Sequence, residues 1–439
     1  MDNQNQNSGK QLAFRYKILR YALRCNIARH LTGESFRKFS IRLADSRLFQ
    51  WFTGISGFEH RKAASKSALD RYEKYFDAAM MDEQIKCWLA ELSDPVKAVE
   101  SAGLKEPVSF ASVFMDSTCV KANIHFPVDW VLLRDAVRSL LLAIKTIRKQ
   151  GLKHRMIDPA VFLRRMNQFC IKMTHTRRRK DSKKQRKLIL REIKQLAHCI
   201  GKHARRYKKM LQGRWQETNW TQPMIQQVIH RIDNILDQLP AAIKQAHERI
   251  IGERPIKNGD KILSLYEPDV HVIVRGKMEN EVEFGQGLLL CEQTDGLIMD
   301  WKFFRDQPPS DSRLLQSIVV DIEKQYGAVD SVCTDRSFDS QQNESFLKAH
   351  HIYDAMCPRS PKQLRARLQE SYFVALQSRR GQTEARIGIF KNAFLGRPLR
   401  SKGFVHKRLA VSWCVLTHNL WVVARMAIAS KRLALQKAA

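Results

Sequence analysis

Three acidic residues, Asp116, Asp335 and Glu384, could together form a site for phosphoryl chemistry. Each aspartate follows a short apolar run, which predicts a strand that ends at a carboxylate. A carboxylate at the C-terminal end of a strand is a common way for an α/β sheet to present a ligand to a metal or a phosphate. Glu384 lies in a basic stretch with helical spacing. Two such aspartates and a helix-borne glutamate supply the hard oxygen ligands of a two-metal site, in which Mg²⁺ or Mn²⁺ ions lie about 3.5 to 4 Å apart.

Two cations flank Glu384 on the same predicted helix. Arg380 lies four residues before Glu384, and Lys391 lies seven residues after it. Steps of about 100° per residue place all three side chains on one helix face. Such a group is normally an exposed ion pair worth about a few tenths of a kcal/mol. The alternative is that Glu384 binds metal while Arg380 and Lys391 hold the phosphates beside it.

Other aspartates compete for a place in this site. Asp129, Asp300 and Asp339 each lie near the end of a predicted strand. Asp339 is better placed to cap the helix that follows it, and Asp300 lies in the middle of its strand. We therefore predict that Asp116, Asp335 and Glu384 are the metal ligands and the catalytic residues.

The cysteines give no sign of a metal site or of disulfide bonds. There are nine of them, scattered along the chain, and no Cys-x-x-Cys pair occurs. This pattern favours reduced thiols over a disulfide framework or a zinc ribbon. One loose cluster fits no known zinc finger. Its members are Cys170, His175, His198, Cys199 and His203.

The elements that would carry the acidic residues are alternating strands and helices. Glycine-containing separators at 276–277, 285–287 and 295–296 are typical of hairpin turns, so the strands around them are expected to be antiparallel. The first strand would join this mixed α/β core across a long insertion. Apolar runs predict strands at 108–115, 270–275, 281–290, 297–304, 329–334 and 352–357, and amphipathic runs predict helices at 311–326 and 341–350.

The insertion, residues 130–255, is predicted to be helical and basic. Apolar residues recur at helical spacing, and Pro240 is expected to end the last helix. Two runs of Lys and Arg lie at 177–187 and 202–209. A charge run is usually a solvated helix face, but in so basic a chain these runs favour contact with phosphates. The predicted contacts are Arg177, Arg178, Arg179, Lys183 and Lys184.

The N-terminal region, residues 11–100, is predicted to be helical after a disordered tail at 1–10. A break containing Gly54 and Gly57 precedes a basic helix that could begin at Ser65 or Ser67. This order suits a helix-turn-helix, whose second helix enters the major groove, but it also suits a small bundle with a solvated basic face. The candidate DNA contacts are Arg61, Lys62, Lys66 and Arg71.

The charge of the chain points to a polyanionic partner. Lys and Arg number 76 against 44 Asp and Glu, which gives a net charge of +32 over 439 residues. Each cation set against a phosphate releases condensed counterions, so nucleic acid is the first expectation. A membrane is not expected, because no uninterrupted apolar run approaches the roughly 20 residues of a spanning helix. The N-terminus also lacks the pattern of a signal peptide, so we expect a cytoplasmic protein, at the DNA.

Taken in order, these segments resemble a DDE transposase of the bacterial insertion-sequence type. The resemblance covers about residues 100–425. Arg380, Glu384 and Lys391 match the Tyr-Arg-Glu-Lys signature of some members, but Gln377 stands at the tyrosine position. The other matching segments are Met-Asp-Ser-Thr at 115–118, Arg-Gly-Lys at 275–277, Val-Glu-Phe-Gly at 282–285, Thr-Asp-Arg-Ser-Phe-Asp-Ser at 334–340 and Gly-Gln-Thr-Glu at 381–384.

The resemblance implies an α/β fold in which an RNase H-like mixed sheet is interrupted by a large helical insertion and preceded by an all-helical DNA-binding domain. The catalytic core would comprise 105–128 and 262–425, the insertion 130–255 and a basic tail 426–439. The three acidic residues would hold two Mg²⁺ or Mn²⁺ ions, and Arg380, Lys391 and Lys277 would contact DNA.

The implied activity is Mg²⁺-dependent cleavage at the element's terminal inverted repeats, followed by attack of the freed 3′-hydroxyl on target DNA. The implied partners are therefore double-stranded DNA and further copies of the chain, as a homodimer or higher oligomer, because two ends must be processed. Two alternatives stay open. One is an RNase H-like nuclease without strand transfer, and the other is a catalytically silent DNA-binding descendant of a transposase.

Overall fold

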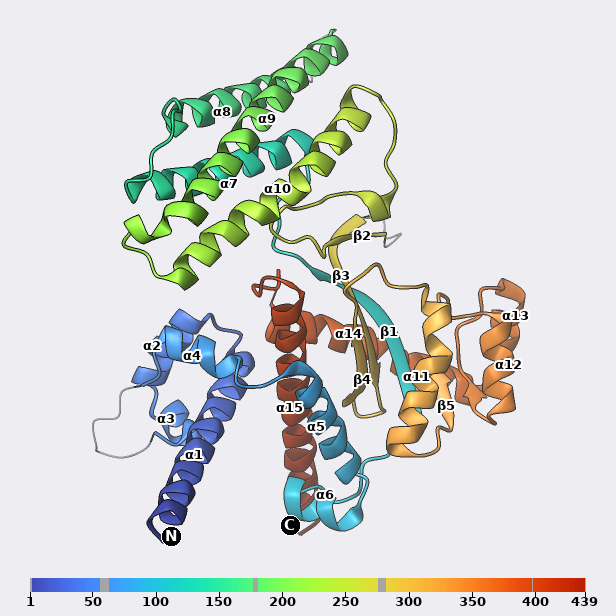
Figure 1. Ribbon diagram of the computed structural model, residues 1–439. Coiled ribbons are helices and arrows are strands. Elements are labelled where there is room, and N and C mark those ends of the chain that lie inside the picture. The colour runs from blue at the N-terminus through green and yellow to red at the C-terminus, as the bar shows by residue number, and fades with distance from the viewer. Residues whose placement is uncertain (1, 56–62, 177–180, 275–281, 397, 439) are drawn as a thin grey trace. The chain divides into compact units, whose positions relative to one another are not determined.

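The chain forms two compact units in a computed structural model that describes residues 2–55, 63–176, 181–274, 282–396 and 398–438, with the side chains of 2–10 and 433–438 left out. Unit 1 comprises 1–122 and 286–439, and unit 2 comprises 123–285. Helices predominate, and the described strands form one mixed sheet (Figure 1). The α/β class predicted from the sequence is therefore confirmed, whereas the division places 262–285 with the insertion rather than with the predicted core.

The sheet has the strand order β2-β3-β1-β5-β6, with β4 paired to β3. β2 and β4 are antiparallel to β3, as the hairpin signals predicted, whereas β5 is parallel to both β1 and β6. The strands are β1 (Ser112–Lys121), β2 (His271–Val274), β3 (Val282–Glu292), β4 (Ile298–Phe303), β5 (Ser331–Cys333) and β6 (Tyr353–Asp354).

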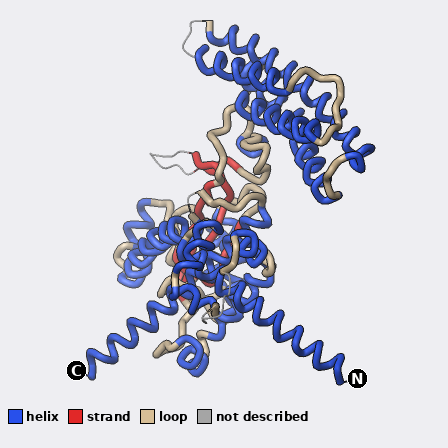
Figure 2. The backbone as a smooth tube through the Cα atoms, turned by 90° about the vertical axis from the view of Figure 1, so that its left-hand side faces the viewer, coloured by secondary structure: helices blue, strands red, loops and turns tan. Residues whose placement is uncertain are grey.

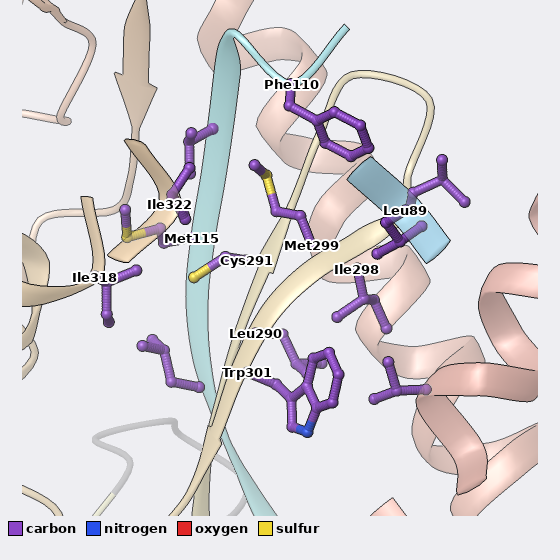
Figure 3. Close-up of a cluster of buried hydrophobic side chains, with 14 of the residues drawn as sticks. Leu89, Phe110, Met115, Leu290, Cys291, Ile298, Met299, Trp301, Ile318 and Ile322 are labelled. Atoms are coloured by element: carbon purple, nitrogen blue, oxygen red, sulfur yellow. The ribbon is translucent and has the colours of Figure 1, made fainter. Parts of the chain in front are cut away.

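Helices of unit 1 pack on both faces of this sheet. The side chains of β1 point alternately to one face and to the other, so each face offers apolar side chains to a helix. Met115 belongs to the main apolar cluster with Ile318 and Ile322, as Figure 3 shows. Phe114, one residue earlier, packs instead with Phe373 and other apolar side chains of a second cluster. These helices are α11 (Asp311–Tyr326), which matches the predicted bounds, α12 (Gln341–Ala349), α13 (Pro361–Arg367), α14 (Ser371–Ile389) with a π-helical turn at Phe390–Leu395, and α15 (Phe404–Ala438).

Two glycines that were predicted to form a hairpin turn have a different position in the structure. Gly285 and Gly287 lie inside β3, not in a turn. A Cβ on Gly287 would come within 2.7 Å of the ring of Pro308, so close packing explains this glycine. Gly296 does lie in the turn between β3 and β4, where its φ of +95° is one that other residues rarely adopt. The separator at 276–277 lies outside the described residues.

The N-terminal helices belong to the same compact unit as the sheet. Residues 2–10, predicted as a disordered tail, lie in the first helix, and the predicted C-terminal tail lies in α15. The ring of His30 stacks on that of Trp413 in α15, with 6.2 Å between the ring centres, so the first and last helices of the chain are in contact. Ser35, Ser46 and Ser65 cap the helices that follow them. The helices are α1 (Asp2–Thr32), α2 (Phe36–Asp45), α3 (Arg47–Thr53), α4 (Lys66–Glu73), α5 (Ala78–Glu91) and α6 (Pro95–Ala102).

One helix in the described part of the chain, α15, is long and apolar enough to cross a membrane by length and composition alone. Its apolar window is 56% buried inside the protein, however. Trp413 and Val415 are fully buried, which is the behaviour of a helix in a protein core.

Unit 2 contains a bundle of four long helices, visible as the all-helical part of Figure 2. Pro240 was expected to end the last of them, but that helix continues through it. An interior proline costs about 3 kcal/mol. Leu236, Leu239 and Ile243 on both sides of it are buried, and this burial offsets the cost. The helices are α7 (Asp129–Lys149), α8 (Pro159–His175), α9 (Ser182–Arg214) and α10 (Gln222–Ile250).

Candidate active site

Asp116 and Asp335 come to the same level of two neighbouring parallel strands. Phe114 of β1 and Cys333 of β5 are register partners, and each aspartate follows two residues later in its own segment. β5 ends at Cys333, so Asp335 lies just beyond a strand end, as predicted. The strand of Asp116 differs from the prediction. It begins at Ser112 and continues to Lys121, which places Asp116 inside β1 rather than at its end.

The alternation of β1 decides which helix Asp116 faces. Asp116 shares a face with Phe114, because residues two apart in a strand point to the same side. Phe114 packs with Phe373 of α14, and the guanidinium of Arg379 lies 4.5 Å from the centre of its ring. Asp116 therefore faces α14, the helix that carries Glu384.

Asp116 is half-buried, and the charges of the other two acidic residues act on it. Burial and the negative charges of Asp335 and Glu384 raise the pKa of Asp116 to about 7, against the opposing charge of Arg380 and the N–H of Ser117. Burial is the largest of these causes. The two carboxylates act in the same direction, which shows that the predicted set shares one electrostatic environment.

Two of the acidic side chains have defined partners. The N–H of Ser337 donates to Asp335 at 2.9 Å, so a local turn fixes this carboxylate. Arg380 lies 3.3 Å from the carboxylate of Glu384, which is the ordinary i,i+4 ion pair that the sequence analysis set against a metal-binding role. The side chain of Glu384 is 61% exposed, whereas that of Arg380 is 19% exposed. Glu384 is thus the more exposed side chain of this ion pair.

The donor set fits a hard divalent cation. Its carboxylate oxygens are the preferred ligands of Mg²⁺ and Mn²⁺, and a cation would relieve the unfavourable charge at Asp116. In the described ranges no three His, Cys, Asp or Glu side chains are close enough together to enclose an ion. A metal ion held by all three acidic residues would therefore require at least one of their side chains to move.

Gln377 connects the end of β5 to Arg380. Its amide nitrogen lies 3.2 Å from the carbonyl oxygen of Thr334, the residue before Asp335. Its amide oxygen accepts a hydrogen bond from Arg380 at 3.1 Å. Gln377 therefore orients Arg380 relative to the site.

Lys391 occupies a different place from the one predicted. It is 5% exposed, and its Nζ donates to the hydroxyl of Thr118 at 2.9 Å. The prediction of a common face with Glu384 assumed a regular α-helix, but the helix changes to a π-helical turn at Phe390. Thr118 lies two residues after Asp116, so Lys391 reaches the face of β1 that carries Asp116.

The competing aspartates have other partners. Asp300 is buried in the middle of β4, as expected, and forms an ion pair with Lys86. Asp129 lies in unit 2, where Arg249 contacts it at 2.9 Å. Asp339 is not the helix cap that was predicted, because Ser340 caps α12. The carboxylate of Asp339 instead accepts the N–H of Arg359 at 2.7 Å.

Two carboxylates around the site were not identified from the sequence. Asp311, at the start of α11, accepts hydrogen bonds from Ser117 at 3.0 Å and Ser337 at 2.7 Å, next to the segments that carry Asp116 and Asp335. Its sequence context, Ser-Asp-Ser at a helix start, indicates only capping. Glu292 is buried at the end of β3 and binds α14. Its position after an apolar run was the only available signal.

The predicted DNA contacts divide between the two units. Lys66 and Arg71 are exposed on α4, and Lys184 is exposed on α9. Lys183, also exposed on α9, contacts Glu253 at 3.1 Å. The remaining predicted contacts, Arg61, Lys62, Arg177, Arg178, Arg179 and Lys277, lie outside the described residues.

Comparisons with protein-family models, with curated proteins and with solved structures found no match to this chain.

Proposed function

We propose that the protein is a DDE-type transposase, which cleaves DNA at the ends of its own element and joins them to target DNA. The observation that carries this proposal is the alignment of two aspartates on neighbouring segments of the sheet, with Glu384 on the helix that Asp116 faces. The register of β1 and β5 aligns Asp116 with Asp335, and Glu384 on α14 is close enough to raise the pKa of Asp116. Such a constellation is what two-metal phosphoryl transfer uses.

The strand order supports an RNase H-like core for this site. When β2 is left aside, the order across the sheet is β4-β3-β1-β5-β6. In chain order this is third, second, first, fourth and fifth strand, as in an RNase H-like sheet. The first and fourth strands then carry the two aspartates, and the long helical insertion follows the first strand.

Asp116, Asp335 and Glu384 would hold two Mg²⁺ or Mn²⁺ ions. When bound, such ions supply an activated water or 3′-hydroxyl and stabilise the leaving oxygen. Arg380, oriented by Gln377, would hold a DNA phosphate once Glu384 turns away from it. Lys391 would act from within the site, because its ammonium group lies against β1.

The double-stranded DNA partners are the element's inverted repeats and the target. The excess of positive charge supports this assignment, and the exposed cations of α4 and α9 are the proposed contacts. Processing two ends together implies a dimer or higher oligomer in the DNA complex. The setting is the bacterial nucleoid in the cytoplasm.

The test is cleavage of labelled duplexes that carry the DNA flanking the gene on each side. The full-length protein is assayed with Mg²⁺, Mn²⁺ or EDTA, beside the variants Asp116→Asn, Asp335→Asn and Glu384→Gln. A matched control is Glu83→Gln, which changes an exposed glutamate on α5. We expect metal-dependent nicking at the ends that the first three variants lose and the control keeps.

The outcomes separate the alternatives. Cleavage that survives in all three variants overturns the assignment of the site. Joining of the cut ends to a supercoiled plasmid distinguishes a transposase from a nuclease without strand transfer. End-specific binding without cutting in any metal would indicate a catalytically silent DNA-binding descendant.

A further inference from the structure

Glu292 is a buried carboxylate outside the set of proposed metal ligands. It is the last residue of β3 and is 4% exposed. Glutamate is rarely this buried unless it is paired. Within the described part of the chain, the partners of its side chain all come from α14, the helix that carries Glu384.

Four donor contacts converge on one oxygen, Oε1, of Glu292. Both terminal nitrogens of Arg379 lie 2.9 Å from it, and the hydroxyl of Thr383 donates to it at 2.6 Å. Arg386 approaches the same oxygen at 3.3 Å. Positions 379, 383 and 386 lie on one face of a helix, so Glu292 selects the face of α14 that is turned toward the sheet.

Arg379 extends this contact to the strand of Asp116. Its guanidinium lies over the ring of Phe114, which shares a face of β1 with Asp116. It also donates to the carbonyl oxygens of Gln293 at 2.9 Å and Thr294 at 2.6 Å, in the turn after β3. One side chain therefore joins α14 to β1 and to the β3–β4 turn.

The turn is shaped to accept α14. Gly296 has a φ of +95°, and a Cβ at this position would come within 2.5 Å of the guanidinium of Arg386. Glu384 directly follows Thr383, so its position depends on this docking. Sliding or rotating α14 by one residue, about 1.5 Å and 100°, would carry Glu384 away from Asp116.

We propose that Glu292 is a positioning residue for the metal site, which holds α14 in the one register that brings Glu384 to Asp116 and Asp335. This inference rests on the proposed function, because it assumes that these three carboxylates bind the ions. Glu292 acts through Arg379 and Thr383 and does not itself touch the metal.

The experiment counts Mn²⁺ bound to the full-length protein by electron paramagnetic resonance. Wild type is compared with Glu292→Gln, and Asp116→Asn identifies the ions that bind at the site. We expect Glu292→Gln to weaken the Asp116-dependent Mn²⁺ affinity about tenfold or more, the usual effect of losing a residue that orients metal ligands.

Asp300→Asn is the matched control for lost stability. Asp300 is 2% exposed on β4 and is the register partner of Cys291, the neighbour of Glu292. It also pairs with a cation on a helix, but that cation is Lys86 of α5. This variant should lose a comparable buried ion pair and keep the Mn²⁺ affinity of the wild type.

Thr383→Val tests the same contact without removing a buried charge, in case Glu292→Gln does not fold. It removes one hydrogen bond to Glu292 at nearly constant volume, and we expect an affinity about fivefold weaker. Wild-type Mn²⁺ affinity in Thr383→Val and in any folded Glu292→Gln overturns the proposal, as does an equal loss in Asp300→Asn. If the wild type has no Mn²⁺ site that depends on Asp116, the proposed function fails and this inference with it. An intact site that is indifferent to Glu292 overturns this inference alone.

Discussion

Lys391 lies inside the protein with its ammonium group 2.9 Å from the hydroxyl of Thr118. Both residues are at most 5% exposed. The sequence predicted that Lys391 contacts DNA, and its burial restricts where such a contact could form. The amino group would act at the site, beside Asp116, and not as one of many surface contacts.

Lys391→Met should lower the rate of strand cleavage about tenfold or more, because it removes a buried donor at the reacting centre while keeping the length of the side chain. The affinity for the DNA ends should change less than about twofold. Single-turnover cleavage and gel-shift titration of the same duplex measure the two quantities. A loss of affinity with normal cleavage of the bound DNA would instead favour an ordinary phosphate contact.

Asp116→Asn should stabilise the metal-free protein at pH 8 by about 1 to 4 kcal/mol. The pKa of Asp116 in the folded protein, about 7, lies above its ordinary value of 3.8. The folded state therefore holds the proton more tightly, and this carboxylate contributes a cost that grows as the pH rises from about 4 to about 7. Urea denaturation in EDTA should show a gain at pH 8 that vanishes near pH 4. Mg²⁺ should stabilise only the wild type, since the variant lacks a ligand.

His418 should make the protein less stable in mild acid. Burial and the nearby charge of Arg386 lower its pKa to about 4, although a contact with Asn419 opposes them. Because the unfolded chain takes up this proton first, the contribution of His418 is complete above about pH 6.5 and is lost as the pH falls to about 4.

The loss from this one group is about 3 kcal/mol. His418→Gln should flatten the dependence of the unfolding free energy on pH between 7 and 5, whatever its effect at neutral pH. His30, whose pKa is also lowered to about 4, contributes the same dependence to both proteins. An unchanged slope would show that His418 takes up its proton in the folded protein at the same pH as in the unfolded chain.

The exposed cations of α4 can be tested by the salt dependence of DNA binding. Lys66→Ala and Arg71→Ala should each weaken binding and reduce the slope of log K against log salt by about 1. Cleavage of bound DNA should be unaffected, because neither residue belongs to the acidic site. Lys348→Ala, which changes an exposed lysine of α12, is the control. Equal slopes for the wild type and both α4 variants would exclude these contacts.

The sequence predicted those parts of the site that depend on local pattern. Helix 311–326 and the position of Asp335 after β5 both follow from residues close together in the chain. The errors concern contacts between distant segments. Gly287 resembles a turn residue until Pro308 is seen against it, and Glu292 acquires its partner Arg379 from 87 residues away. No local pattern encodes such pairs.

The burial of Lys391 could not be predicted for a related reason. Its spacing from Glu384 is correct for a regular helix, and only the packed structure shows the π-helical turn that redirects it. Pro240 illustrates the opposite case, in which burial overrides a strong local signal.

The division of the chain into units also dictates an order of events during synthesis. Unit 2 is one continuous segment, so it can fold while the rest of the chain is still being translated. Unit 1 cannot, because its sheet waits for β5 to pair with β1, and His30 waits for Trp413. Glu384 also leaves the ribosome more than two hundred residues after Asp116. A nascent or prematurely terminated chain therefore contains basic helices long before Asp116, Asp335 and Glu384 can come together, and the proposed activity would be confined to the finished protein.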